Sequence, residues 1–333
     1  MNSDTRALAQ VSLAYIWWGG SAIFWNELGS VTPIDQLAWR VVTAFVYLAL
    51  GGLLFRKRLL AAGVEASLFA RGGVRTHLTR KHLAYGIGAA IMIFANWGLF
   101  LVAIDNGQAV EAAFGYFLMP VLSVALGIGL LGERLRRLQV GALVLSSIGI
   151  IWTVAVLGRL PLIAISVGLT FALYGLFRKQ GPWDSVSGLT FETGLFAPFL
   201  ALALVLRGVS GEAIFGDGAA TTIVLVVLTG VVTMVPLLAF ASASRKVPLS
   251  VIGLLQYINP TLQFIVGWQV LGESVSMGRL VGFAWIWAAL ALIVADELAS
   301  KRPVDGVATR GDESTVHPGE GLAPQKAAVR RQR

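Results

Sequence analysis

Three charged residues stand inside long apolar stretches of this 333-residue chain: Arg40, Glu111 and Glu192. A charge at the centre of a bilayer costs about 2.5–3.5 kcal/mol on insertion scales, so such residues usually face a protein interior or a water-filled cavity. Arg40 could bind an anionic substrate, pair with either glutamate, or extend to the outer interface. The glutamates could carry protons or contact substrate, or could be carboxylates near helix ends that the helix dipole favours.

Amide and aromatic side chains in the same stretches are further candidates for a substrate pocket. A buried amide needs a hydrogen-bond partner, whereas many Trp and Tyr residues of membrane proteins lie only at the lipid interface. The candidates are Tyr15, Trp18, Asn96, Trp97, Tyr116, Gln256, Tyr257 and Asn259. With Arg40, Glu111 and Glu192, we expect residues of this set to bind substrate.

The residue inventory argues against enzyme chemistry. The chain has no Cys, and its three His residues are His77, His82 and His317, outside the apolar stretches. Thiol catalysis, Cys-ligated metals and a Ser/His/Asp triad are therefore not expected. No phosphate-binding loop of the Walker type is present. We expect no catalytic residues, no metal site and no cofactor.

The composition is that of a membrane protein. Apolar residues make up 56% and charged residues 13% of the chain, with a mean hydropathy of +0.75. Soluble domains carry about 25% charged residues, so most of this surface must face lipid. The net charge of +8 comes from Lys and Arg between the apolar stretches, which argues for lipid headgroups as partners and against nucleic acid.

Ten apolar stretches are long enough to cross a bilayer, which takes about 20 residues. They are residues 8–27, 34–55, 83–104, 108–131, 138–157, 160–177, 187–206, 219–241, 248–271 and 279–297. With the N-terminus inside, the alternate loops and the tail hold 22 Lys and Arg, and the opposite loops hold three. The positive-inside rule therefore predicts that both termini are cytoplasmic. Residues 298–333 are rich in charge, Pro and Gly, and we expect a disordered cytoplasmic tail.

An internal repeat relates the two halves of the chain. Residues 131–133 (Leu-Gly-Glu) recur at 271–273, and Pro120 recurs as Pro260, both at an offset of 140. Five spans per half is an odd number, so the halves, residues 1–157 and 158–297, would be inverted in the membrane. Inverted repeats are the structural basis of alternating access in many transporters.

The repeat also marks candidate gating residues. Glu133 and Glu273 follow the two repeated helices, and we expect salt bridges or backbone capping there. Pro120, Pro236 and Pro260 lie within spans, where each removes a backbone donor. They could serve as hinges, line a cavity, or only kink the helix for packing.

Several stretches together carry a family resemblance: Asn96-Trp97, residues 111–117, Pro120, and residues 132–137, 171–179 and 256–261. They resemble the RarD-type permeases of the EamA family, within the drug/metabolite transporter superfamily. The resemblance covers about residues 8–297 and implies an all-α permease of ten transmembrane helices in two EamA repeats, in the inner or plasma membrane. Two positions depart from the family pattern: Trp39 stands where the family commonly has His, and Met119 where it often has Asn.

We therefore expect a secondary transporter that exports small organic metabolites or amphipathic drugs, driven by a proton or solute gradient. The alternatives are a lipid flippase or lipid-modifying membrane enzyme, and a structural or regulatory membrane subunit. A lateral, lipid-facing polar cavity would favour the flippase, and a catalytic cluster would favour the enzyme. The sequence does not indicate the oligomeric state.

Overall fold

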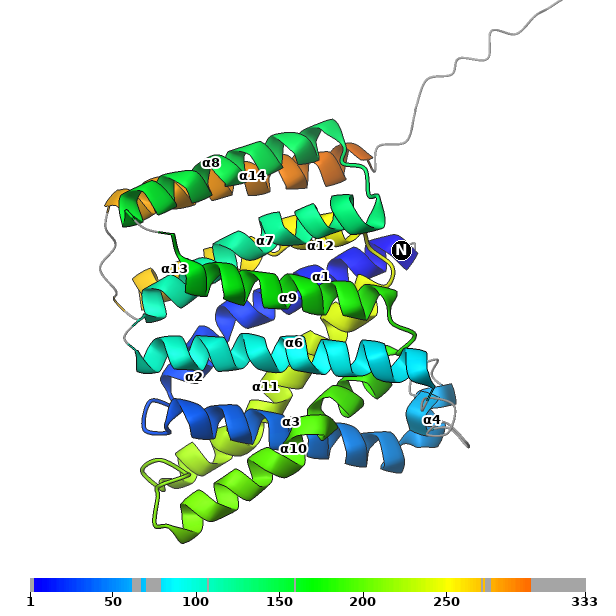
Figure 1. The fold of residues 1–333 in the computed structure, drawn as a ribbon, viewed down its shortest axis with the longest axis vertical. Coiled ribbons are helices and arrows are strands. Elements are labelled where there is room, and N and C mark those ends of the chain that lie inside the picture. Colours follow the sequence, from blue (N-terminus) through cyan, green and yellow to red (C-terminus); the bar gives the residue numbers. More distant parts are fainter. Residues whose placement is uncertain are drawn as a thin grey trace, which may run out of the picture.

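The computed structural model describes residues 3–61, 67–69, 79–106, 108–158, 160–270, 272 and 277–300, and this part of the chain is helical (Figure 1). Nine helical segments in it are long and apolar enough to cross a membrane, and residues Leu280–Asp296 form a shorter apolar segment. The protein is thus an all-α, multi-pass membrane protein, as predicted.

Nine candidate spans and the helix with the shorter apolar segment follow one another in the described residues. Those of the first half are α1 (Ser3–Gly20) continued by α2 (Ala22–Asn26), α3 (Pro33–Leu54), α6 (Arg80–Asp105), α7 (Ala109–Leu131) and α8 (Arg137–Leu157). Those of the second half are α9 (Leu162–Gln180), α10 (Ser185–Val209), α11 (Ala220–Ser244), the run α12 (Leu249–Leu255), α13 (Ile258–Ile265) and η2 (Val266–Val270), and α14 (Met277–Ser300). Two short helices, α4 (Arg56–Ala61) and η1 (Ser67–Phe69), lie between α3 and α6.

The predicted first and ninth spans are interrupted rather than continuous. The first breaks at Ser21, whose hydroxyl donates a hydrogen bond to the carbonyl of Trp18 at 2.8 Å. The ninth breaks at Gln256 and Tyr257, because Pro260 has no N–H to give to the carbonyl of Gln256. That carbonyl accepts instead from the N–H of Asn259, at 3.0 Å, which tightens the turn.

The repeated Leu-Gly-Glu motif has a structural reason. Gly132 and Gly272 both adopt left-handed backbone angles, with φ of 65° and 69°. Gly132 ends α7 in this conformation, which glycine adopts without the steric penalty of a side chain. The equivalent glycines of the two halves therefore share a backbone conformation.

The packing of the helices is symmetric under exchange of the two halves. Helices α3 and α10, α7 and α12, and α8 and α14 each pack against their own equivalent. Other extensive contacts also match under this exchange. The contact of α7 with α9 corresponds to that of α13 with α1, α6 with α9 corresponds to α11 with α1, and α3 with α11 corresponds to α6 with α10. Figure 1 shows α8 and α14 together at one end of the molecule and α3 and α10 at the other. This symmetry agrees with the predicted repeat, whose division between residues 157 and 158 stays a prediction.

An aromatic core joins the halves at the centre. Tyr15 and Trp18 of α1 contact Phe240 of α11, with ring centroids 6.4 and 6.2 Å apart. Phe171 of α9 lies 5.4 Å from the same ring. The outer surface carries large apolar side chains as well, such as Leu53 and Phe199. A protein that is apolar inside and out is suited to a lipid environment.

Candidate functional site

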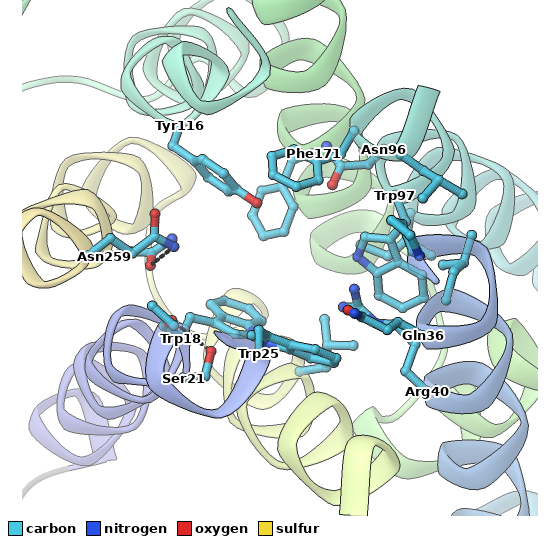
Figure 2. A pocket seen from close by; sticks show the side chains of 18 of the residues that line it. Trp18, Ser21, Trp25, Gln36, Arg40, Asn96, Trp97, Tyr116, Phe171 and Asn259 are labelled. Carbon is cyan, nitrogen blue, oxygen red and sulfur yellow. Dashed lines mark hydrogen bonds between the residues drawn. The ribbon is translucent and has the colours of Figure 1, made fainter. Parts of the chain in front are cut away.

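A cavity of about 500 Å³ lies between the two halves (Figure 2). Its walls come from α1, α2, α3, α6 and α7 of the first half and from α9, α11 and the broken ninth span of the second. The exposed side chain of Asn26 belongs to its lining, so the cavity reaches the surface near the end of α2. The volume is in the range of small-molecule sites.

Seven of the eleven candidate substrate-binding residues line this cavity. They are Trp18, Arg40, Asn96, Trp97, Tyr116, Gln256 and Asn259. They come from five different spans and from both halves, so the fold brings together residues more than 200 positions apart in the sequence. Substrate binding by these residues remains a prediction.

Arg40 is held on one wall of the cavity by the beginning of α3. Thr32 caps this helix by accepting a hydrogen bond from the N–H of Asp35 at 3.4 Å, and Pro33 occupies its first turn. Asp35 is buried and pairs with Arg207 of α10, with Nε and Oδ1 3.0 Å apart. This ion pair fixes the end of α3 from which Arg40 projects, two turns further along.

The guanidinium of Arg40 faces two tryptophans. Its central carbon lies 4.2 Å from the ring centre of Trp97 and 5.1 Å from that of Trp25. Its Nε atom is buried and has no hydrogen-bond partner among the described residues. The side chain therefore stays in the cavity wall rather than extending to the interface, and its partners there are aromatic faces.

Two of the predicted amides, Asn96 and Gln256, reach the cavity from different helices. The Nδ2 of Asn96 donates to the carbonyl of Val167 at 2.7 Å and to the hydroxyl of Thr170 at 3.2 Å, which joins α6 to α9. The Nε2 of Gln256 faces the sulfur of Met119 at 2.9 Å, a weak acceptor. Both amides therefore cross-link helices while their other polar atoms remain for a ligand.

Asn259 and Tyr116 lie on the side of the cavity away from Arg40 (Figure 2). Asn259 accepts a hydrogen bond from Nε2 of Gln263 at 3.1 Å through its side-chain oxygen. Figure 2 shows the Tyr116 ring extending into the cavity with its hydroxyl foremost. Both groups are thus positioned to meet a molecule between α7 and α13.

Two of the aromatic candidates do not line the cavity. Tyr257 is fully buried, and its hydroxyl lies 3.4 Å from the carbonyl of Phe117. Tyr15 is also fully buried and donates to the carbonyl of Ile252 at 3.2 Å. Their observed contacts tie α1 and α7 to the broken ninth span, behind the cavity wall.

Glu192 pairs with Arg178, not with Arg40 as one of our hypotheses had it. Arg178 Nη1 and Glu192 Oε1 are 2.8 Å apart, with both side chains buried, and the Tyr174 hydroxyl donates to the other oxygen at 3.2 Å. We expected Arg178 in the loop after the sixth span, which the sequence predicts to end at residue 177. Instead, α9 continues to Gln180, so Arg178 lies within this helix. A buried carboxylate requires such a partner. Glu111 belongs to α7, but its side chain lies outside the described part of the structure.

Glu133 connects the end of α7 to the beginning of α12. One carboxylate oxygen accepts from the N–H of Leu249 at 2.8 Å, and the other accepts from the N–H and hydroxyl of Ser250 at 2.8 and 2.7 Å. The Nζ of Lys179 lies 3.6 Å from the carboxylate. Burial raises the pKa of Glu133, but the hydrogen bonds from Ser250 and Leu249 and the charge of Lys179 together lower it below its ordinary value.

These contacts are of both expected kinds, backbone capping and a salt bridge, although a gating role remains a prediction. We call Glu133, Lys179, Leu249 and Ser250 the Glu133 latch. It lies 14 residues beyond the cavity residue Met119, or about 20 Å at 1.5 Å per residue, so it is at the opposite end of α7 from the cavity mouth. The equivalent Glu273 is outside the described residues.

The three prolines have different neighbours. Pro236 leaves the carbonyl of Val232 without its helical donor, and the indole N–H of Trp17 donates to that carbonyl at 3.1 Å. Pro120 lies where α7 crosses α12 so closely that a side chain on Gly253 would come within 2.9 Å of the Pro120 carbonyl. Pro260 is buried beside the break in the ninth span. Pro236 and Pro260 thus leave carbonyls that find other donors, as expected where a helix is packed within protein.

Sequence reasoning missed several residues of the cavity wall, among them Trp25 and Gln36. Helical spacing could have found them, because Trp25 lies two turns after Trp18 and Gln36 one turn before Arg40. Gln36 also donates to the carbonyls of Leu28 and Val31, which folds the turn between α2 and α3 against the cavity. Among the described residues, His, Asp and Glu form no group of three that could hold a metal ion.

Comparison with known proteins places this architecture among transporters. Residues 5–155 match the EamA-like transporter family. The protein RarD of Escherichia coli K12 is 37% identical over 289 residues, which covers 87% of this chain and 94% of that protein. An uncharacterized transporter of Vibrio cholerae is 34% identical over 86% of this chain and 90% of its own length.

The uncharacterized transporter YojE of Bacillus subtilis is 32% identical over 89% of this chain and 96% of its own length. A solved crystal structure with 20% sequence identity superposes with a TM-score of 0.65, over 90% of this chain and all of the other. At that level of identity, the likeness concerns the fold.

Proposed function

This chain belongs to the EamA-like transporter family, and from that premise we propose that it is a drug/metabolite transporter that moves small organic solutes across the membrane by alternating access. The observation that carries the proposal is the cavity between the halves, with polar groups from both of them around it. A site at the interface of two inverted repeats lets one side open as the other closes.

The two ends of the molecule support this proposal because they differ. The cavity reaches the surface near Asn26, at the beginning of α3 and the end of α6. The Glu133 latch closes the other end, where α7, α9 and α12 meet through charge-assisted hydrogen bonds. In our proposal, transport breaks this latch and forms its counterpart in the other half.

The orientation completes the proposal. The distribution of Lys and Arg favours cytoplasmic termini in the plasma or inner membrane. With that orientation, the cavity opens away from the cytoplasm and the latch lies on the cytoplasmic side. We propose export as the direction of net transport, with a proton gradient as the driving force and a carboxylate such as Glu111 or Glu192 as the proton carrier.

The experiment that tests the proposal uses purified protein in sealed liposomes with an imposed pH gradient. A panel of amino acids, organic acids and amphipathic drugs is offered while solute uptake and lumenal pH are followed. Flux of one solute together with proton movement supports proton-coupled transport. Solute flux without proton movement would exclude the proton as the coupling ion. Labelled lipids form a second panel, and lipid movement without solute flux would replace the proposal with a flippase.

A matched pair of variants ties the flux to the cavity. Asn259→Leu removes an amide from the cavity wall, whereas Asn106→Leu removes an exposed amide at the end of α6. We expect flux to fall at least tenfold in the first and to persist in the second. Equal flux in both variants would overturn the cavity as the transport site.

A further inference from the structure

The described lining of the cavity contains a positive charge and no acidic side chain. Among the described residues that line it, Arg40 is the one charged side chain. The other polar groups there are amides and hydroxyls, which carry no net charge. The described wall therefore has a single positive charge beside a space for a small molecule.

None of the ion pairs among the described residues includes Arg40. Asp35 is paired with Arg207, and Glu192 is paired with Arg178. The faces of Trp97 and Trp25 stabilise the guanidinium. These contacts replace only part of the hydration that a buried cation loses, so an anion in the cavity would add the missing stabilisation.

We propose that the cavity selects solutes with one negative charge, a carboxylate, attached to a flat apolar body. This inference rests on the proposed transport function and names its substrate class. A carboxylate matches the planar donor fork of a guanidinium. One cation in the wall favours a monoanion over a doubly charged phosphate ester, because the second charge would be desolvated without a partner.

The rest of the cavity fits the remainder of such a solute. The tryptophans beside Arg40 and the ring of Phe171 present apolar surfaces to a flat body. On the opposite wall, Asn259 has its oxygen engaged by Gln263, so its NH₂ group is left to donate to the solute. Figure 2 shows Tyr116 and Arg40 on different sides of this space, with Trp25 and Trp97 on the side of Arg40.

The test measures binding of four probes that share one ring and differ in charge: phenylacetate, phenylacetamide, 2-phenylethylamine and phenyl phosphate. The full chain is placed in phosphatidylcholine nanodiscs, which contain no anionic lipid, and titrated calorimetrically at pH 7.5. We expect phenylacetate to bind at least tenfold more tightly than each of the other three. Tighter binding of the amide, the amine or the phosphate ester would overturn the inference, and so would absence of phenylacetate binding at millimolar concentration.

Variants at Arg40 test whether this residue causes the preference for a negatively charged solute. Arg40→Gln should weaken phenylacetate binding by about 10- to 100-fold, which is the value of a hydrogen bond to a charged group, and should leave phenylacetamide unchanged. Arg40→Lys should retain part of the preference. Arg6→Gln removes an exposed positive charge outside the cavity lining and should change nothing. Equal phenylacetate affinity in folded Arg40→Gln and in the wild type would overturn the inference.

The outcomes separate this inference from the proposed function. Flux of a neutral or cationic solute in liposomes, blocked by Asn259→Leu, would leave the transporter standing and overturn the charge preference. Absence of all solute flux, together with lipid movement, would overturn the function itself. Should Arg40→Gln fail to fold, Arg40→Lys and the comparison of the four probes on the wild type decide the question.

Discussion

The carboxylate of Glu133 receives two hydrogen bonds from Ser250, one from its backbone N–H at 2.8 Å and one from its hydroxyl at 2.7 Å. The two residues are 117 positions apart. Glu133 thereby caps the N-terminal turn of α12, where unpaired N–H groups and the helix dipole favour a negative charge. The contact holds the halves together at the end of the molecule away from the cavity mouth.

Replacement of this carboxylate should open the latched end. Glu133→Gln keeps one acceptor oxygen but loses the charge, and we expect a shift of about 1–2 kcal/mol, or about 5- to 30-fold, toward the state open on that side. The chain has no native Cys, so Ser123→Cys, at a buried site in α7, provides a single thiol. Its labelling by an impermeant reagent added from the Glu133 side should accelerate accordingly. Glu27→Gln, at an exposed carboxylate after α2, should not change the rate, and an unchanged rate in Glu133→Gln would argue against a latch.

The latch should also respond to acid. Because the folded pKa of Glu133 lies below its ordinary value of 4.5, the stabilisation is complete above that value and is lost as pH falls through the lowered pKa. Thiol labelling at position 123 from the Glu133 side should therefore be flat from neutral pH to about pH 5 and rise at lower pH. In Glu133→Gln this rise should be absent; a rise of the same size there would assign the acid response to another group.

The buried pair of Arg178 and Glu192 should behave as a unit. Glu192→Gln leaves a buried guanidinium without its counter-charge and should destabilise the protein by about 3–5 kcal/mol. The double variant Arg178→Met with Glu192→Leu removes both charges and should recover most of that loss. Thermal unfolding of the purified proteins, followed by size-exclusion chromatography, measures the difference. Additive losses in the double variant would show that the two side chains do not stabilise each other.

The contact between Trp17 and the Val232 carbonyl should depend on Pro236. Trp17→Phe removes the indole donor and should cost about 0.6–1.7 kcal/mol, the range for interhelical hydrogen bonds in membranes. Pro236→Ala supplies the missing helical N–H, so the Trp17→Phe effect should be smaller in that background. A double-mutant cycle on unfolding free energy tests this coupling. Equal effects of Trp17→Phe in both backgrounds would contradict it.

The spans could be predicted from the sequence, for physical reasons. A bilayer imposes a minimum apolar length, so the nine candidate spans and the shorter apolar helix that follows them could be recognised. The shared spacing of Pro120 and Pro260 predicted the repeat. The break at Gln256 was not foreseen, because a mid-span proline is compatible with a kink, a hinge or an interruption. Which outcome occurs depends on whether the freed carbonyl finds another donor.

Side-chain partnerships were harder to foresee. Arg40 and Glu192 are both eighth residues of their helices, α3 and α10, yet the first faces tryptophans and the second an arginine. That difference arises from α9, where Arg178 sits one residue past the predicted span. The continuation of α9 by three residues, to Gln180, makes this expected loop charge a buried partner. Such pairings depend on the rotation of each helix about its axis, which the apolar pattern of an all-round hydrophobic helix does not specify.

The exchange-symmetric packing has a consequence for the order of events during synthesis. The most extensive helix contacts all cross between the halves, as in α7 with α9 and α1 with α11. The first five spans therefore leave the ribosome before the surfaces they will cover exist, and α1 waits for a helix more than 200 residues behind it. Until then, the polar groups of the future cavity wall must be sheltered by lipid headgroups, the insertion machinery or transient neighbours. The native packing of this protein therefore forms late, when the helices of the second half have entered the membrane and packed between those of the first.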